Sequence, residues 1–458
     1  MKNIKLYIAY LLVLTTVACD GDLEIAPVSQ LSTDSFYQTE ADFEQAMIGA
    51  YSGIKDQYQN VYVFGDIRSD NTVPVTSGSV TTLQDFDNFT LDSSNLLLGP
   101  TWNLAYRIIA RVNLILDRID DADIDAEVVN RIKGEALFIR GMAYFDLVRW
   151  FGNVPLVLTE TNATEALEFP QSTPDEVYNQ VIADLNTASG LLPVSYGGND
   201  VGRATSTAAK ALLGRVQLTI GNFPAAESEL RAVTALEGNN VNLLTDFADI
   251  FDITNEYNSE IIFAVRYADD GLNGNGFNFN FSFPQNPDNK ATGTDLFDSY
   301  DPTDIRRDLT LNTEISPGEI VMFKYGRGDN GRGESDWPVI RYADVLLMLS
   351  EAINEQGYVA DGEAFDFLNR IRLRAGLTAL TSVEVSNQEA FRLAVEDERR
   401  LELAGEGHRW FDLVRTGRYT TVLADKGAVD TSNIFPIPLA EIQKINDPSI
   451  LKQNPGYQ

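Results

Sequence analysis

Paired amphipathic segments are the feature that most limits the folds open to this chain of 458 residues. One pair covers 206–236, where two apolar-patterned segments meet at a Gly-Asn-Phe turn, and another covers 340–377. In both pairs, apolar residues recur at the spacing of one helix face. Small residues between Ala209 and Ala226 would let two antiparallel helices approach closely, in the manner of a tetratricopeptide unit. The pattern predicts an all-α scaffold built from helical hairpins.

Further stretches carry the same helical periodicity, at 39–58, 101–119, 128–152 and 172–193. Two of them begin with capping residues. Thr39 precedes the first, and Thr173 precedes the last, with Pro174 and Glu176 at the positions of a capping box. Because the helix pairs are unevenly spaced along the chain, we expect an array interrupted by insertions rather than a regular solenoid.

Two regions, at about 60–100 and 255–340, break the helical pattern. Both are rich in Asp, Asn, Ser, Thr and Gly and also contain aromatic residues, and we expect long ordered loops with short strands there. Loops of this length within a compact domain are usually functional or disordered, and the aromatic content favours function. Binding residues are therefore expected in these two regions, since loops on a rigid scaffold commonly carry them.

Composition excludes some partners and ligands. Lys and Arg total 35 against 67 Asp and Glu, which gives a formal charge of −32. Because nucleic acid needs a positive surface, we expect no nucleic-acid partner. The chain has one Cys and one His, so an internal disulfide and a histidine-rich metal site are both ruled out. Asp-rich loops could supply oxygen ligands to Ca²⁺, but none has full calcium-loop spacing, and no cofactor or metal is predicted.

The N-terminus has the features of a secretory signal rather than of a membrane span. Two Lys precede an apolar run at 8–17 that is too short to cross a bilayer, and Cys19 follows. The ending Thr-Val-Ala-Cys resembles a bacterial lipobox, in which the Cys carries the lipid. We expect a lipoprotein signal peptide at 1–18, lipidation of Cys19 and a surface tether at 19–30. The alternative is an ordinary cleaved signal in which Cys19 occurs by chance.

A dense block of charge occupies 398–419, with the sequence ERRLELAGEGHRWFDLVRTGRY and the only histidine, His408. The block invites a catalytic interpretation, but its opposite charges lie three to four residues apart, and such charges on a helix usually pair with each other. Two Gly then break the helix, and Trp410, Phe411 and Leu413 follow at positions that face inward. We predict an ion-paired corner that locks the C-terminal helices, not a catalyst.

A series of segments runs in a set order along almost the whole chain. After the lipobox they are WNLAYRIIARVNLIL, EALFIRGMAYFDLVRWFGNVPLV, GRATSTAAKALLGRVQLTIGNFPAA, NSEIIFAVRY, PVIRYADVLLMLSEAINE, LNRIRLRAGL, ERRLELAGEGHRWFDLVRTG, FPIPLAEI and NPGY. Each is weak alone, but together they resemble the SusD/RagB family of Bacteroidetes outer-membrane lipoproteins.

The resemblance implies a single domain at 31–458, in which a tetratricopeptide-like scaffold carries an inserted, loop-rich ligand-binding surface. It also implies a protein of the outer membrane, lipid-anchored and exposed at the cell surface. Members of the family cover a TonB-dependent transporter of the SusC type and deliver glycans to it without cutting them. The expected function is therefore glycan capture for transport, and the protein is not expected to be an enzyme.

Sugar recognition requires flat aromatic rings that stack on pyranose faces, together with Asp, Asn and Arg that bond to hydroxyls. In the first loop region the candidates are Asp66, Arg68, Asp70 and Asn71, with Trp102 on the helix beside it. The alternative for the four polar residues is a turn held by Asx hydrogen bonds. The alternative for Trp102 is core packing.

The second loop region supplies the aromatic candidates. Trp337, flanked by Gly, Asp and Ser, is expected to be exposed and is the main candidate for stacking. Phe277, Phe279 and Phe281 alternate with Asn and predict a strand-like run with one apolar face, from which we take Phe277 and Phe279 as candidates. The alternative for Trp337 is a plug that covers the helix beginning near Ile340, and the alternative for the three Phe is core packing.

The strong negative charge favours a neutral polymer such as a β-glucan, a fructan or an α-glucan, although Arg68, Arg327 and Arg332 leave a uronate open. Two other functions remain as alternatives. One is a structural or peptide-capturing lid on the transporter. The other is a glycosidase, which would need two carboxylates across a cleft, and no motif singles out such a pair.

Overall fold

Most of the described chain is helical, as the sequence predicts. The computed structural model describes residues 36–74, 81–268, 274–282, 289–326 and 333–457. Its longer helices are α2 (Glu40–Tyr58), α4 (Leu98–Ile119), α5 (Ala126–Phe151), α6 (Pro174–Leu191), α7 (Ser206–Thr219), α8 (Phe223–Thr234), α12 (Tyr342–Gln356), α13 (Glu363–Arg374) and α14 (Gln388–Glu402). Shorter ones are η1 (Val63–Ile67), α3 (Thr81–Asp87), α9 (Phe277–Ser282), α10 (Leu296–Ser299), α11 (Arg306–Thr310), α15 (Arg409–Arg415), α16 (Tyr419–Val422) and α17 (Leu439–Ile445). Within the described ranges, no helix combines the length and the apolar character that a membrane crossing requires.

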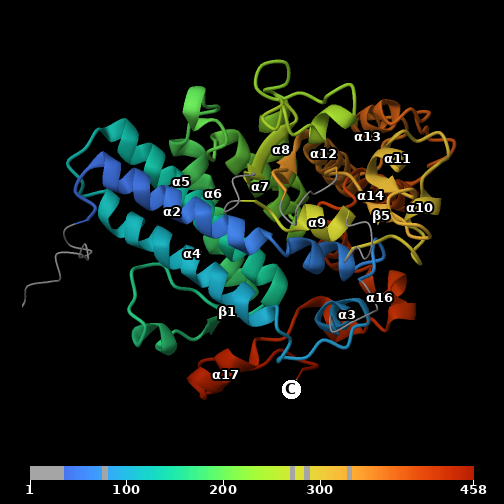
Figure 1. The fold of residues 1–458 in the computed structure, drawn as a ribbon. Coiled ribbons are helices and arrows are strands. Elements are labelled where there is room, and N and C mark those ends of the chain that lie inside the picture. Colours follow the sequence, from blue (N-terminus) through green and yellow to red (C-terminus); the bar gives the residue numbers. More distant parts are fainter. Residues whose placement is uncertain (1–35, 75–80, 269–273, 283–288, 327–332, 458) are drawn as a thin grey trace, which may run out of the picture.

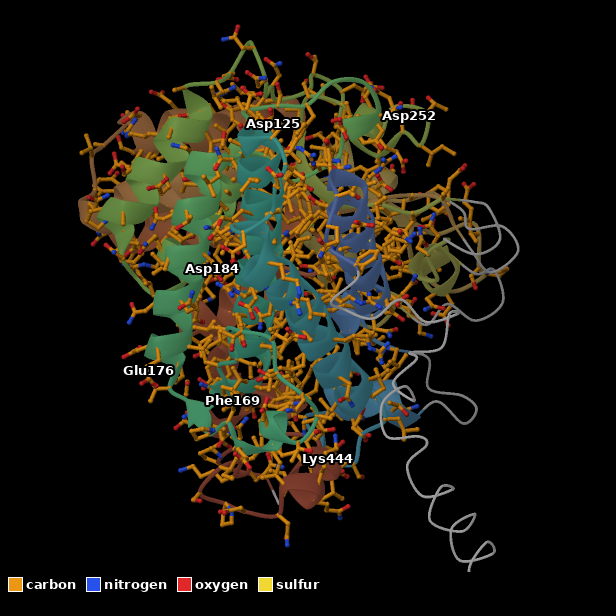
Figure 2. The ribbon with its side chains drawn as sticks, turned by 90° about the vertical axis from the view of Figure 1, so that its left-hand side faces the viewer. Asp125, Phe169, Glu176, Asp184, Asp252 and Lys444 are labelled. Carbon is orange, nitrogen blue, oxygen red and sulfur yellow. The ribbon has the colours of Figure 1, made fainter. Side chains whose placement is uncertain are left out.

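Both predicted capping residues start their helices. The hydroxyl of Thr39 accepts the N–H of Asp42, and the Asp42 carboxylate accepts the N–H of Thr39 in return. At the start of α6, Thr173 and Glu176 make the same reciprocal pair of hydrogen bonds. Figure 2 shows Glu176 near this end of α6, with Asp184 further along the helix. These side chains satisfy backbone N–H groups that would otherwise lack a partner at a helix start.

The helices form a continuous packed array. Helix α4 packs against α2 and α5, and the contacts continue from α5 through α6 and α7 to α8 (Figure 1). A side chain at Gly214 would place Cβ 2.7 Å from Leu230, so this glycine permits the close approach of α7 and α8. Helix α8 then packs on α12, although the segment 235–341 lies between them in the chain. The expectation of an interrupted helical-hairpin array is confirmed.

The inserted segment contains the predicted short strands together with helical turns that the sequence pattern did not reveal. Strand β3 (Ile261–Val265) pairs antiparallel with β6 (Trp337–Arg341), with Ile261 opposite Arg341 and Val265 opposite Trp337. Two smaller antiparallel pairs complete the strands of the described residues: β1 (Val154–Pro155) with β2 (Gln171–Ser172), and β4 (Leu311–Asn312) with β5 (Val321–Met322). The β3–β6 ribbon joins the two ends of the insertion and leads directly into α12.

The strand predicted around Phe277 is wrong, because this segment is helix α9. The side chain of Asn275 accepts the N–H of Asn278 (3.0 Å), as a helix cap does. Phe277 and Phe281, four residues apart, then lie on one buried face. The alternation of Phe and Asn suggested a strand. The preceding Asn-Gly pair instead starts a helix.

The C-terminal block folds into the predicted ion-paired corner. Arg399 donates to Asp344 of α12 (2.7 Å) and to Asp412 of α15 (3.0 Å), and so ties α14 to both neighbours. Arg415 bonds to Glu351 of α12 and to Asp412. These charges are buried or nearly so, as required if such a network is to contribute more than a surface pair.

Glu402 is the centre of this network. Its carboxylate accepts from Arg306 (2.9 Å), Arg341 (2.6 Å) and Arg374, and all four side chains are buried. Burial alone would raise the pKa of Glu402, but the three guanidinium groups outweigh it and hold the pKa well below its ordinary value. Arg306 comes from the insertion and Arg341 ends β6, so one carboxylate joins the corner to the inserted segment.

Removing the charge of Glu402 should therefore destabilise the whole domain. Glu402→Gln keeps the shape but leaves three buried cations short of a partner, and we expect a loss of about 3–5 kcal/mol in the free energy of unfolding. Glu363→Gln is the control, because Glu363 is half exposed and pairs with Arg231 at the surface, where a pair contributes about 0–1 kcal/mol. Urea unfolding followed by circular dichroism measures both. Equal losses in the two variants would contradict a central role for Glu402.

Candidate functional site

The four polar candidates of the first loop region lie on and after η1, where they hold the C-terminal corner. The carboxylate of Asp66 is fully buried and accepts the N–H groups of Gly405 (3.1 Å) and Gly407 (2.8 Å). Asp70 forms a bidentate ion pair with Arg409, at 2.7 and 2.8 Å. The structure thus brings this loop and the charged block together, although they are more than 300 residues apart in the chain.

Asn71 and Arg68 have internal partners as well. The Asn71 side chain accepts from Arg400 (3.1 Å) and donates to Asp66 (3.3 Å). Arg68 is 1% exposed, donates to the carbonyl of Phe86 (3.0 Å) and lies 3.7 Å from the centre of the Phe89 ring. The expectation that these side chains face a ligand is not met, because Asp66, Arg68 and Asn71 are buried and Asp70 is paired with Arg409.

The aromatic candidates whose side chains the structure describes are buried. Trp337 is 1% exposed and stacks on Tyr325, with Phe277 at its edge, so the expected exposed platform is wrong. Trp102 is 5% exposed and packs against Tyr106 and Phe151. Burying apolar surface stabilises the folded state, and these rings pack against other aromatic rings in the core. The side chain of Phe279, and Cys19, lie outside the described part of the structure.

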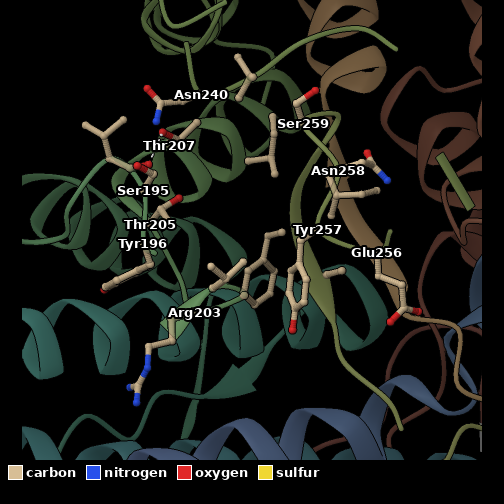
Figure 3. A pocket seen from close by; sticks show the side chains of 18 of the residues that line it. Ser195, Tyr196, Arg203, Thr205, Thr207, Asn240, Glu256, Tyr257, Asn258 and Ser259 are labelled. Carbon is tan, nitrogen blue, oxygen red and sulfur yellow. Dashed lines mark hydrogen bonds between the residues drawn. The ribbon is translucent and has the colours of Figure 1, made fainter. Parts of the chain in front are cut away.

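A cleft of about 290 Å³ opens elsewhere, between the α6–α7 connection and the approach to β3 (Figure 3). Hydroxyl and amide side chains gather along it. They are Ser195, Thr205, Thr207, Asn239, Asn240, Asn258 and Ser259. In Figure 3 the ring of Tyr257 lies between Thr205 and Asn240 on one side and Asn258 and Glu256 on the other. Such a lining has the donors, acceptors and flat ring that a polyhydroxylated ligand needs.

Tyr257 is presented by a stiff turn. The carboxylate of Asp252 accepts both the N–H and the hydroxyl of Thr254 (2.8 Å each), which starts the turn. Buried Asn258 donates to the carbonyl of Ile250 (3.0 Å) and accepts the N–H of Glu260 (3.1 Å), which ends it. The Tyr257 side chain between these anchors stays 44% exposed. An exposed ring on a fixed backbone is suited to stacking, because little freedom is lost when a ligand binds.

Two carboxyl groups flank this ring with raised pKa values. Burial, followed by the charge of Asp336, raises the pKa of Glu256 to about 7. Burial raises the pKa of Asp336 to about 6. The carboxylate of Glu256 accepts the backbone N–H of Asp336 (2.8 Å), and the carboxylate of Asp336 accepts the backbone N–H of Tyr267 (2.7 Å). Shared burial of two acids is enough to shift both, without any catalytic role.

A second cavity of about 190 Å³ adjoins the cleft. It lies between α2 and β3, where Ile48, Ile54 and Phe263 give it a largely apolar lining. The two cavities share Val201, Gly202, Arg203, Phe263, Ala264 and Arg266. They are two separate cavities, one polar and one largely apolar, on either side of this shared lining.

Across the described residues, no three His, Cys, Asp or Glu side chains come together in a group that could hold a metal ion. The tyrosine ring and the amide and hydroxyl side chains of the cleft offer stacking and hydrogen bonding. Sequence reasoning did not single out Tyr257. The only available signal was the cluster of Asp252, Asn255 and Asn258 around it, which is typical of an exposed turn.

Two family models match separate parts of the sequence. One is described as "SusD family" and matches 319–457, and the other is described as "Starch-binding associating with outer membrane" and matches 23–218. Among curated proteins, SusD-like protein P2 of Formosa agariphila is 27% identical over the full length of both chains.

Solved structures agree with these matches. A laminarin-binding SusD-like protein is 28% identical, with a TM-score of 0.80 over 92% of this chain and 100% of that one. Surface glycan-binding protein A from Bacteroides fluxus is 25% identical, with a TM-score of 0.79 over the same shares. Together with the helical-hairpin scaffold and its ion-paired C-terminal corner, these matches establish that the chain belongs to the SusD/RagB family.

Proposed function

We propose that this protein captures a neutral glucan at the cell surface and delivers it, uncut, to a SusC-like TonB-dependent transporter. The observation that carries the proposal is the exposed ring of Tyr257, set in a cleft lined by amide and hydroxyl side chains. Sugar rings present C–H faces to such a platform and hydroxyl groups to the side chains around it. A starch-binding family and a surface glycan-binding protein are among the matches, and they support the same class of ligand.

A laminarin-type β-glucan is the first ligand to test. The structural relative at 28% identity is described as laminarin-binding, and this chain covers all of that protein's length. The other neutral polymers expected from the sequence, fructan and α-glucan, form the rest of the panel. In affinity electrophoresis, we expect laminarin to retard the protein. If no glycan of the panel retards it, the proposal is contradicted.

The proposal has three further parts. Cys19 is lipidated, residues 19–30 form a tether, and residues 31–458 form a single domain. The family description that places its members at the outer membrane supports this location. A lipid anchor with several acyl chains would hold the protein stably at that surface.

Capture without cleavage is favoured over glycoside hydrolysis. A glycosidase needs two carboxyl groups held apart on either side of the bond to be cut. Each of the acids beside the ring is instead bonded to a backbone group, Glu256 to the N–H of Asp336 (2.8 Å) and Asp336 to the N–H of Tyr267 (2.7 Å). Their raised pKa values follow from burial, so the proposal assigns them no catalytic step.

The cations of the cleft are already paired, which favours a neutral ligand. Arg203 bonds to Glu44 (2.7 Å), Asp200 (2.9 Å) and Glu135 (3.2 Å). Arg266 lies 3.5 Å from Asp336. The charge of Arg203 is therefore offset by three carboxylates, and an anionic sugar would also meet Glu256, so the charge of the cleft opposes uronates.

Stacking on Tyr257 predicts a large effect from one substitution. Tyr257→Ala should weaken laminarin binding by about 1–3 kcal/mol, or roughly 5- to 150-fold in Kd, if sugar stacking resembles base–aromatic stacking. Isothermal titration calorimetry measures the change. Leu96→Ala, at an exposed apolar side chain that does not line the cleft, should leave Kd unchanged. Equal affinities for Tyr257→Ala and the parent protein would remove this ring from the site.

The raised pKa values predict how selectivity changes with pH. At pH 8 both Glu256 and Asp336 are ionised and should disfavour carboxymethylated laminarin relative to laminarin. At pH 5, below both pKa values, both acids are mostly neutral while the ligand's carboxylates stay charged. The preference for laminarin over its carboxymethylated form should therefore shrink, by about fivefold for a repulsion of about 1 kcal/mol.

Glu256→Gln should reduce that preference already at pH 8, and Glu363→Gln, a remote substitution of the same charge, should not. The measurement is the ratio of the two Kd values at each pH. A ratio that is the same at pH 5 and pH 8 would show that these acids do not face the ligand.

A further inference from the structure

One face of the Tyr257 ring is covered by a guanidinium group. The centre of the Arg266 guanidinium lies 4.1 Å from the ring centroid, which is a cation–π contact. The same side chain reaches Asp336, with 3.5 Å between Nε and the carboxylate, and remains 45% exposed. Arg266 thus occupies a ring face on which a sugar would stack.

Arg266 also lies in the wall that the polar and apolar cavities share. Below it is Gly202, with φ of +99°. A Cβ at this glycine would lie 2.8 Å from Cδ of Arg266 and 3.1 Å from the Tyr257 ring, so the absent side chain makes room for both. The backbone at Gly202 therefore leaves space for the Arg266 side chain to lie over the Tyr257 ring.

The two arginines of the shared wall differ in how firmly they are held. Arg203 is bonded to three carboxylates at 2.7–3.2 Å, and its side chain is 19% exposed. Arg266 has one long ion pair and the ring contact, and it is more than twice as exposed. Asp336 is buried, but its ion pair with Arg266 is long and the Arg266 side chain is half exposed. Because exposed cation–π contacts are weak as well, we expect Arg266 to leave the ring at small cost.

We propose that Arg266 is a gate in the glycan-binding cleft, an inference that rests on the proposed function. Closed, the side chain covers one face of Tyr257 and separates the two cavities. Open, it frees that face and joins the cavities into one groove, which a longer glucan segment can fill. Arg266 then sets which chain lengths bind, because only a ligand that uses both cavities gains the contacts that offset the opening.

The gate is tested first without any ligand, by hydroxyl-radical footprinting of Tyr257. Arg266→Ala should increase oxidation of this ring, and Asp336→Asn, which weakens the anchor but keeps an acceptor for the N–H of Tyr267, should increase it less. Tyr196, which lines the same cavity, is the internal reference. Unchanged Tyr257 oxidation in both variants would overturn the proposal.

Binding is tested second, with laminarin oligosaccharides of increasing length. Arg266→Ala should tighten binding by about two- to fivefold, the equivalent of one exposed cation–π contact, and should do so for short chains at least as much as for long ones. Weaker binding in Arg266→Ala would identify Arg266 as a ligand contact and overturn the gate. Increased oxidation of Tyr257 in variants that bind no glycan would support the gate and contradict the proposed function instead.

Discussion

The fold depends on a carboxylate–guanidinium network that is fully withdrawn from water. Glu402 and Glu406 of the C-terminal block meet Arg341 at the end of β6, and Arg341 also bonds to Glu260 (2.9 Å) just before β3. Each of these charges would be costly to bury alone, so the arrangement is stable only when every partner is in place. That requirement fixes the start of β3 against the end of β6.

The cleft inherits its geometry from this arrangement. Tyr257 and Glu256 lie immediately before Glu260 in the chain, Arg266 follows β3, and Asp336 precedes β6. The proposed platform consists of the turn that carries Tyr257 and the adjacent ends of β3 and β6. The buried salt-bridge network holds these segments rigidly in place. The charged block at 398–419 thus supports the proposed binding surface, although none of its residues lines either cavity.

The scaffold was predictable because its determinants are local. Helical periodicity and the caps at Thr39 and Thr173 depend on neighbours in the sequence. Pairing of charges three to four residues apart was expected in the C-terminal block and occurs between Asp412 and Arg415, but Arg399 and Glu402 find partners in distant segments instead. The candidate site was not predictable in the same way. Asp66 and Trp337 have residue types and flanking residues typical of ligand sites, but Asp66 finds its partners at Gly405 and Gly407, and Trp337 at Tyr325 and Phe277. A polar or aromatic residue in a long loop is equally suited to a ligand and to a distant part of its own chain, and only the folded structure separates the two.

The central claim is that the ligand lies on Tyr257 and not on the aromatic residues of the insertion core. A crystal structure with a bound laminarin oligosaccharide tests it most directly. We expect a glucosyl ring in van der Waals contact with the face of Tyr257, with hydroxyl groups bonded to the amide and hydroxyl side chains of the cleft. An oligosaccharide bound at another surface, with the Tyr257 cleft empty, would contradict the account.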